Sequence, residues 1–194
     1  SIGTYGAYLA DGSEYRGDYV ISDQELTDFH KPRINLLDNS TADILACETI
    51  PCFQEAKVLS EILENVKKPA WISFSCKDGK HISDGTPIEQ CAAYFAHHPT
   101  VFAIGVNSTS PEFISALIRS IKTKSGNKKI VVYPNSGAVY HAEGKTWTGL
   151  SDLSSCEIMV KEWMDLGADI IGGCCGIGPQ QFKAMSKIIS KIDA

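Results

Sequence analysis

The sequence has no apolar run that approaches the roughly 20 residues of a membrane-spanning helix, and its best stretch, residues 101–106, is far too short. Basic residues are also in deficit, because 18 Lys and Arg stand against 23 Asp and Glu. The resulting net charge of -5 argues against nucleic acid or an anionic membrane as the main partner. The first residues carry neither a basic leader nor an apolar segment, so we expect no secretion signal.

The seven cysteines lack the even count and the regular spacing of a disulfide framework. Because no secretion signal is expected, reduced thiols in a cytoplasmic protein are the better interpretation. The cysteines are Cys47, Cys52, Cys76, Cys91, Cys156, Cys174 and Cys175.

Length and composition are those of one globular domain. The 194 residues are 43% apolar and 21% charged, and no shift in composition divides them. We therefore predict a single domain over residues 1–194.

Short apolar runs alternate with helical patterns along the chain. The runs are nearly continuous in apolar residues, as expected for parallel strands that are covered on both faces. They occupy residues 1–3, 44–48, 70–75, 102–106, 130–133 and 169–173. Between and after them, helices are predicted over about residues 23–37, 54–66, 87–96, 155–166 and from Ser110-Pro111 and Gly178-Pro179. The chain thus repeats a βα unit six times.

Two α/β architectures accommodate six such units: a doubly wound open sheet, or a (β/α)8 barrel of which this chain covers about six of the eight units. The sequence has no G-x-G-x-x-G and no P-loop, which an open sheet often carries after an early strand. Polar or reactive residues instead follow nearly every predicted strand, as at the active face of a barrel. Glu48, Cys76, Asn107, Asn135 and Cys174 are examples. We therefore predict the barrel.

Residues 172–176, Gly-Gly-Cys-Cys-Gly, form the strongest local signal. Adjacent residues of a regular strand point to opposite faces, so neighbouring cysteines do not ordinarily share a ligand. Flanking glycines let the backbone leave the strand, and both thiolates of Cys174 and Cys175 could then face one zinc ion. The alternative is a pair of buried cysteines that pack as small apolar residues.

Seven ordered blocks resemble homocysteine S-methyltransferases, most closely the bacterial and fungal enzymes that use S-methylmethionine. The blocks are residues 6–19, 47–51, 84–87, 105–107, 132–137, 145–147 and 172–176. The resemblance implies a methyltransferase in which three cysteine thiolates hold Zn²⁺ and the homocysteine sulfur takes the open fourth position. The thiolate attacks the methyl carbon of a sulfonium donor, S-methylmethionine or S-adenosylmethionine, and methionine forms.

The resemblance also assigns roles to individual residues. Glu48 matches the family glutamate that is associated with the amino group of homocysteine. Asn107 and Asn135 lie at equivalent strand ends and are candidates to orient the substrate, although each could equally satisfy loop backbone groups. The histidines have no ligand-like spacing, so we interpret them as structural or surface residues.

Two departures from the family pattern stand out. The third zinc cysteine follows the Gly-Val-Asn strand end in the family, but here that position is Ser108, whose hydroxyl is a hard, neutral ligand. The chain also begins within what would be the third strand, which leaves two sheet edges open. We expect those edges to be covered by a homodimer or by a missing N-terminal segment.

These departures support a second hypothesis, a catalytically impaired family member that binds homocysteine or a partner chain without turnover. A thiol–disulfide protein that uses Cys174 and Cys175 is a third, but redox pairs normally follow a Cys-x-x-Cys pattern.

Overall fold

A computed structural model describes residues 1–137, 139–141, 143, 146–148 and 153–192. Its centre is a six-stranded parallel sheet in the order β1-β2-β3-β4-β5-β8. The strands are β1 (Ile2–Gly3), β2 (Leu45–Ile50), β3 (Ala70–Phe74), β4 (Val101–Asn107), β5 (Lys129–Tyr133) and β8 (Ile170–Ile171). All six predicted strands are therefore confirmed.

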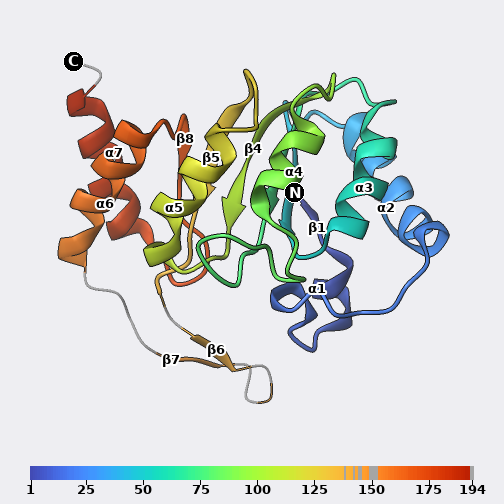
Figure 1. The fold of residues 1–194 in the computed structure, drawn as a ribbon, viewed down its shortest axis with the longest axis horizontal. Coiled ribbons are helices and arrows are strands. Elements are labelled where there is room, and N and C mark those ends of the chain that lie inside the picture. Colours follow the sequence, from blue (N-terminus) through green and yellow to red (C-terminus); the bar gives the residue numbers. More distant parts are fainter. Residues whose placement is uncertain (138, 142, 144–145, 149–152, 193–194) are drawn as a thin grey trace.

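A helix follows each strand of the sheet (Figure 1). The long helices are α2 (Asp23–Asp38), α3 (Phe53–Leu63), α4 (Ile88–Phe95), α5 (Pro111–Lys122), α6 (Leu153–Leu166) and α7 (Pro179–Ile192). All six agree with the predicted helices. The sequence patterns did not indicate α1 (Tyr5–Leu9), the 3-10 helix η1 (Ser13–Tyr15), or the antiparallel hairpin of β6 (Val139–His141) and β7 (Thr146–Thr148). Lys145, part of one family block, lies outside the described residues.

The strand order decides between the two architectures. A doubly wound sheet reverses its order at a switch point, where helices change from one face of the sheet to the other. Here every strand pairs with the next strand of the sheet along the chain, and no reversal occurs among the described strands. Because crossovers between parallel strands are right-handed, all the crossover helices lie on the same face. This is the arrangement of consecutive units in a (β/α)8 barrel.

The register assigns each side chain to one of the two faces. Ile72, Ile104 and Val132 are fully buried on the face that packs against the helices. Ser73 pairs with Gly105, and Asn107 pairs with Tyr133, on the opposite face, which forms the interior side of the barrel. Polar residues therefore gather on the interior side, near the carboxyl ends of the strands.

Gly105 allows β4 and β5 to approach closely. A Cβ at this position would lie 1.6 Å from the carbonyl oxygen of Val131. No side chain fits in that space, so glycine is required here.

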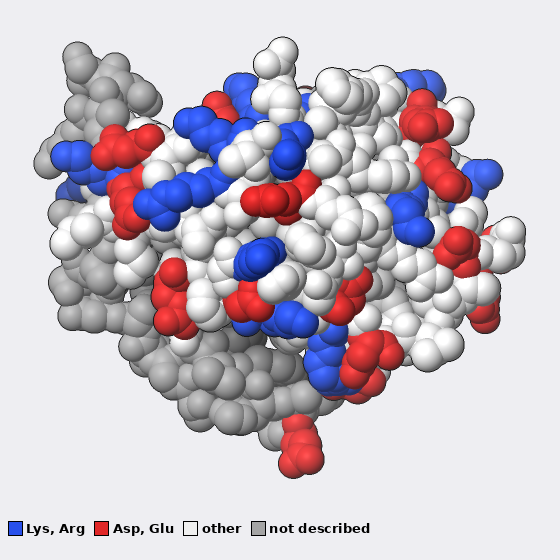
Figure 2. Space-filling view, in the orientation of Figure 1, with Lys and Arg blue, Asp and Glu red and all other residues white. Residues whose placement is uncertain are grey.

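Helix α2 begins with a capping box, in which the Ser22 side chain accepts from the Glu25 N–H and the Glu25 carboxylate accepts from the Ser22 N–H. Basic and acidic side chains alternate over the helical layer on the face that Figure 2 shows. In the part of the chain that the structure describes, no helix is long and apolar enough to cross a membrane.

A buried network attaches the N-terminal segment to the domain. The Glu55 carboxylate accepts hydrogen bonds from the Thr4 hydroxyl (2.7 Å), the Tyr5 N–H (2.7 Å) and the Tyr19 hydroxyl. The His30 ring lies 2.6 Å from the same carboxylate, and both side chains are fully buried. This contact agrees with the structural interpretation of His30.

Candidate metal and substrate site

All six residues that the sequence singled out lie at the carboxyl ends of strands, on one edge of the sheet. Glu48 belongs to β2 and Asn107 ends β4, and both have interior-side positions in the register. Ser108 directly follows β4, and Asn135 lies two residues after β5. Cys174 and Cys175 follow β8 after two glycines. In a barrel this edge is the active face.

The side chains of Cys174 and Cys175 approach each other closely. Their sulfurs are 3.9 Å apart. A Cβ at Gly173 would lie 2.3 Å from Ile177 Cγ2, and Gly176 has a φ of 77° with a hypothetical Cβ 2.2 Å from Ser136 Oγ. Two thiolates on one tetrahedral zinc, each about 2.3 Å from the metal, would be about 3.8 Å apart. The observed separation therefore suits a shared ion.

Ser108 joins this pair. Its hydroxyl oxygen lies 3.0 Å from Cys174 Sγ, and its side chain is almost fully buried. The residue has a φ of 49°, which is uncommon for a residue with a Cβ and marks a sharp departure from β4. The structure thus brings together the three positions that the family resemblance assigns to the metal.

The donor set fits zinc only in part. In the described residues no group of three or more His, Cys, Asp or Glu side chains could hold a metal ion. Cys174 and Cys175 offer two strong ligands, while Ser108 offers a neutral hydroxyl that binds zinc less well than a thiolate. The residues therefore fit a zinc ion with two thiolate ligands and one weak oxygen ligand.

Hydrogen bonds set the protonation of the two thiols. Cys175 donates to Cys174, the Ser108 hydroxyl lies beside it, and together these contacts lower the pKa of Cys174 to about 6 although burial opposes the shift. The same interaction raises the pKa of Cys175, because its proton is held between the two sulfurs. The interaction therefore favours the thiolate at Cys174 and the thiol at Cys175 when no metal is bound.

Glu48 is half-buried and faces the same edge. Its Oε2 accepts a 3.0 Å hydrogen bond from the Tyr133 hydroxyl, and its Oε1 accepts from the Ser1 hydroxyl. Burial, and then the charge of Glu48, raise the pKa of Tyr133, so the phenol remains a proton donor. The carboxylate keeps partial access to solvent and could accept a cationic group from a ligand.

The two asparagines differ from each other. The Asn107 amide is fully used by the protein: its Oδ1 accepts from the Thr49 N–H and the Ser73 hydroxyl, both at 2.8 Å, and its Nδ2 donates to the Thr49 hydroxyl (2.7 Å) and to the Ser108 hydroxyl (3.3 Å). Asn135 Oδ1 accepts from the Gly137 N–H at 2.9 Å and orders the loop after β5. Each asparagine thus accepts a hydrogen bond from a backbone N–H, which is what we expect of a residue that satisfies loop backbone groups.

Comparison with known proteins identifies the chain. Residues 1–189 match the sequence profile described as Homocysteine S-methyltransferase. The chain belongs to the homocysteine S-methyltransferase family. It is 49% identical over 187 residues to homocysteine S-methyltransferase YbgG of Bacillus subtilis, covering 96% of this chain and 59% of that protein. It is 42% identical over 187 residues to the homocysteine S-methyltransferase of Escherichia coli, covering 95% of this chain and 60% of that protein.

Solved structures agree with this membership. The oxidized form of the homocysteine methyltransferase MmuM from Escherichia coli superimposes with a TM-score of 0.82 at 38% identity, covering 94% of this chain and 58% of that one. Its metallated form gives a TM-score of 0.81. This homocysteine S-methyltransferase family chain therefore has six consecutive units of a (β/α)8 barrel. It spans less than two thirds of the length of these relatives.

Two tyrosines at the site of this family member, Tyr15 and Tyr133, were not among the site residues predicted from the sequence. Tyr133 is the last residue of the apolar run at residues 130–133, and only the structure shows that its hydroxyl contacts Glu48. The Tyr15 hydroxyl lies 3.9 Å from Cys175 Sγ, which brings the N-terminal segment to the cysteine pair. Tyr15 does belong to residues 6–19, the longest block of family resemblance, so that block was the available signal.

Proposed function

We propose that this protein is a homocysteine S-methyltransferase that transfers a methyl group from S-methylmethionine or S-adenosylmethionine to homocysteine. The observation that carries the proposal is the convergence of Cys174, Cys175 and Ser108 at one strand-end site, with Glu48 on the same edge of the sheet. Membership of the family supports the same conclusion.

The proposed reaction moves one methyl group between two sulfurs. The homocysteine thiolate attacks the methyl carbon, the bond from that carbon to the sulfonium sulfur breaks, and the bonding pair stays on the departing sulfur. The leaving molecule is a neutral thioether, so no acid is needed to protonate it. Both products are thioethers, and with S-methylmethionine as donor both are methionine.

Zn²⁺ held by Cys174, Cys175 and the Ser108 hydroxyl would supply Lewis acidity that keeps the homocysteine sulfur deprotonated near neutral pH. The chain's own residues supply the remaining functions. The carboxylate of Glu48 binds the homocysteine ammonium group. Asn107 positions the Ser108 hydroxyl through the hydrogen bond from its Nδ2. Asn135 shapes the loop after β5, along which the substrate lies.

A second candidate is a family member that binds homocysteine without turnover. The hydroxyl at Ser108, in place of a thiolate, favours it because a weaker metal site would be filled less often. The experiment below separates the two candidates.

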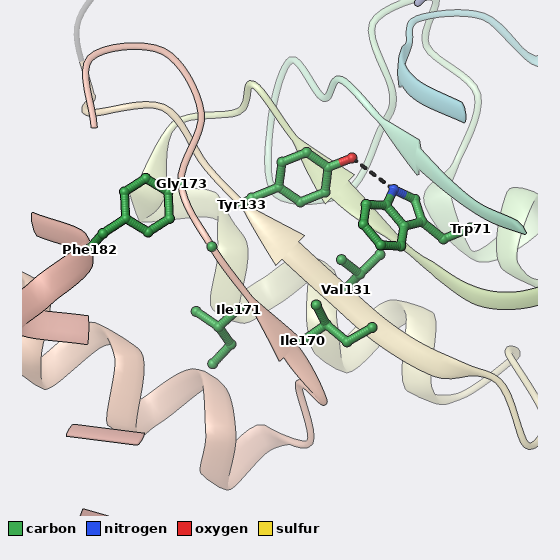
Figure 3. A pocket seen from close by; sticks show the side chains of 8 residues that line it. Trp71, Val131, Tyr133, Ile170, Ile171, Gly173 and Phe182 are labelled. Atoms are coloured by element: carbon green, nitrogen blue, oxygen red, sulfur yellow. Dashed lines mark hydrogen bonds between the residues drawn. The ribbon is translucent and has the colours of Figure 1, made fainter. Parts of the chain in front are cut away.

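We also propose that further βα units, from a longer chain or from a second copy in a homodimer, cover the edges of the sheet. β1 and β8 are the edge strands, and unpaired strand edges normally require a partner. Beside β8 the interior side presents an apolar pocket (Figure 3). Its lining includes Trp71, Val131 and Phe182. A cytoplasmic location is proposed from the free thiols among the described cysteines.

The test is methionine formation by the purified chain with zinc, homocysteine and each sulfonium donor in turn, measured by mass spectrometry with a labelled methyl group. Labelled methionine that requires zinc and that falls strongly in Cys175→Ser supports the transferase. Homocysteine binding without labelled product supports the second candidate. Neither binding nor product would refute both.

A further inference from the structure

A line of close polar contacts connects Glu48 with the cysteine site. The Tyr133 hydroxyl donates to Glu48 Oε2 at 3.0 Å and lies 2.6 Å from the Ser73 hydroxyl. Ser73 lies 2.8 Å from Asn107 Oδ1, and Asn107 Nδ2 lies 3.3 Å from the Ser108 hydroxyl. Strands β2, β3, β4 and β5 each contribute, so the line exists only because the register is as observed.

Two of these bonds have a fixed direction, because each hydroxyl has only one proton. The Tyr133 hydroxyl donates to Glu48 Oε2, and the Ser73 hydroxyl donates to Asn107 Oδ1. The phenol oxygen accepts from Trp71 Nε1 at 3.1 Å. Figure 3 shows the bond between Trp71 and Tyr133 beside the apolar pocket. The Tyr133 hydroxyl is thus fixed between Trp71 Nε1, which donates to it, and Glu48 Oε2, which accepts from it.

We propose that Tyr133 is a positioning residue that holds the ionised carboxylate of Glu48 in place to bind the ammonium group of homocysteine. This inference rests on the proposed function, because it takes homocysteine as the ligand of Glu48. The phenol is anchored by Trp71 and Ser73, so it approaches the carboxylate from a fixed direction. Oε2 is held by Tyr133, and Oε1, which accepts from the exposed Ser1 hydroxyl, still has a lone pair for a ligand.

The test compares homocysteine with 4-mercaptobutanoate, which is homocysteine without its amino group. Titration calorimetry of the zinc-loaded chain measures both affinities for the unchanged protein, Tyr133→Phe and Glu48→Gln. Phenylalanine keeps the ring and removes only the hydroxyl. We expect Tyr133→Phe to bind homocysteine roughly 10- to 100-fold more weakly, the effect of a hydrogen bond to a charged group, with 4-mercaptobutanoate affinity unchanged.

A double variant separates positioning from general destabilisation. If Tyr133 acts through Glu48, then Tyr133→Phe has little further effect when Glu48→Gln is already present. Tyr94→Phe is the matched control, because Tyr94 is an exposed tyrosine on α4, and we expect both affinities to stay unchanged. Should Tyr133→Phe fail to fold, Ser73→Ala removes the hydroxyl that lies 2.6 Å from the phenol oxygen and should weaken the binding of homocysteine selectively.

The outcomes are distinct. Selective loss of homocysteine binding in Tyr133→Phe supports the positioning role, even if the chain transfers no methyl group. Equal losses for both ligands, or no loss, would overturn that role and leave the transferase proposal intact. An unchanged protein that fails to prefer homocysteine over 4-mercaptobutanoate would overturn the role of Glu48 and, with it, that of Tyr133.

Discussion

Replacing Ser108 by cysteine should convert a two-thiolate metal site into a three-thiolate site. The residue already has a Cβ at a φ of 49°, so the exchange adds no backbone strain. Its hydroxyl oxygen is 3.0 Å from Cys174 Sγ, and Cys174 Sγ is 3.9 Å from Cys175 Sγ. A sulfur at position 108 would therefore form one face of a tetrahedron together with the edge that the other two sulfurs define.

The expected gain follows from the energy of structural zinc sites. Four protein ligands together give apparent binding energies of about 10–16 kcal/mol, or roughly 2.5–4 kcal/mol for each ligand. Ser108 already provides a weak oxygen contact, so its exchange for a thiolate should add about 2–3 kcal/mol. That energy corresponds to a zinc dissociation constant roughly 30- to 150-fold lower.

Competition with a chromophoric chelator at fixed pH measures this change, because the absorbance of the chelator reports the zinc that the protein removes. Ser186→Cys is the matched control, since it adds a thiol on the exposed side of α7. We expect Ser186→Cys to leave the affinity at the level of the unchanged chain.

An unchanged affinity in Ser108→Cys would refute the assignment of position 108 to the metal. An equal gain in Ser186→Cys would show that any additional thiol suffices, which would refute the site geometry as the cause. A large gain confined to Ser108→Cys, together with a faster methyl transfer, would identify Ser108 as the residue that limits this chain.

Three further predictions concern packing and protonation. Gly105→Ala places a Cβ against the Val131 carbonyl oxygen, 1.6 Å away, so we expect a loss of more than about 4 kcal/mol in stability and little soluble protein in an expression test. Glu55→Ala leaves several buried donors without an acceptor and should lower the free energy of unfolding in urea by about 3–5 kcal/mol; a loss below 1 kcal/mol would contradict the network. In metal-free protein the iodoacetamide reaction of Cys174 should rise as the pH passes about 6, because the thiolate is the reactive form. Cys175→Ala should move this rise to higher pH, and mass spectrometry of the modified peptide measures both.

Continuous apolar runs made the architecture predictable. Strands such as residues 102–106 are buried on the helix face and pair on both edges, so their sequence carries little polar alternation. Start signals such as Ser110-Pro111 agree with the observed beginning of α5 at Pro111. The hairpin Val139–His141 and Thr146–Thr148 and the short helix Tyr5–Leu9 contain too few residues for a period to be read.

The site was predictable where a strand ends and a motif begins, as at Cys174 and Ser108. Tyr133 and Ser73 were not, because their contacts depend on how distant strands align rather than on any local pattern. Asn107 shows what the sequence leaves out. The sequence places this residue at a strand end, but only the structure shows that its side-chain amide is hydrogen-bonded to Thr49 and Ser73.

The uninterrupted strand order has a consequence for how the chain acquires its structure. Each βα unit contacts mainly the units before and after it, as in a solenoid, so ordering can start at any adjacent pair and spread outward. Contacts between near neighbours favour fast folding. The middle of the sheet, where β3, β4 and β5 meet over Gly105, has neighbours on both sides and should be the last part to exchange its amide hydrogens.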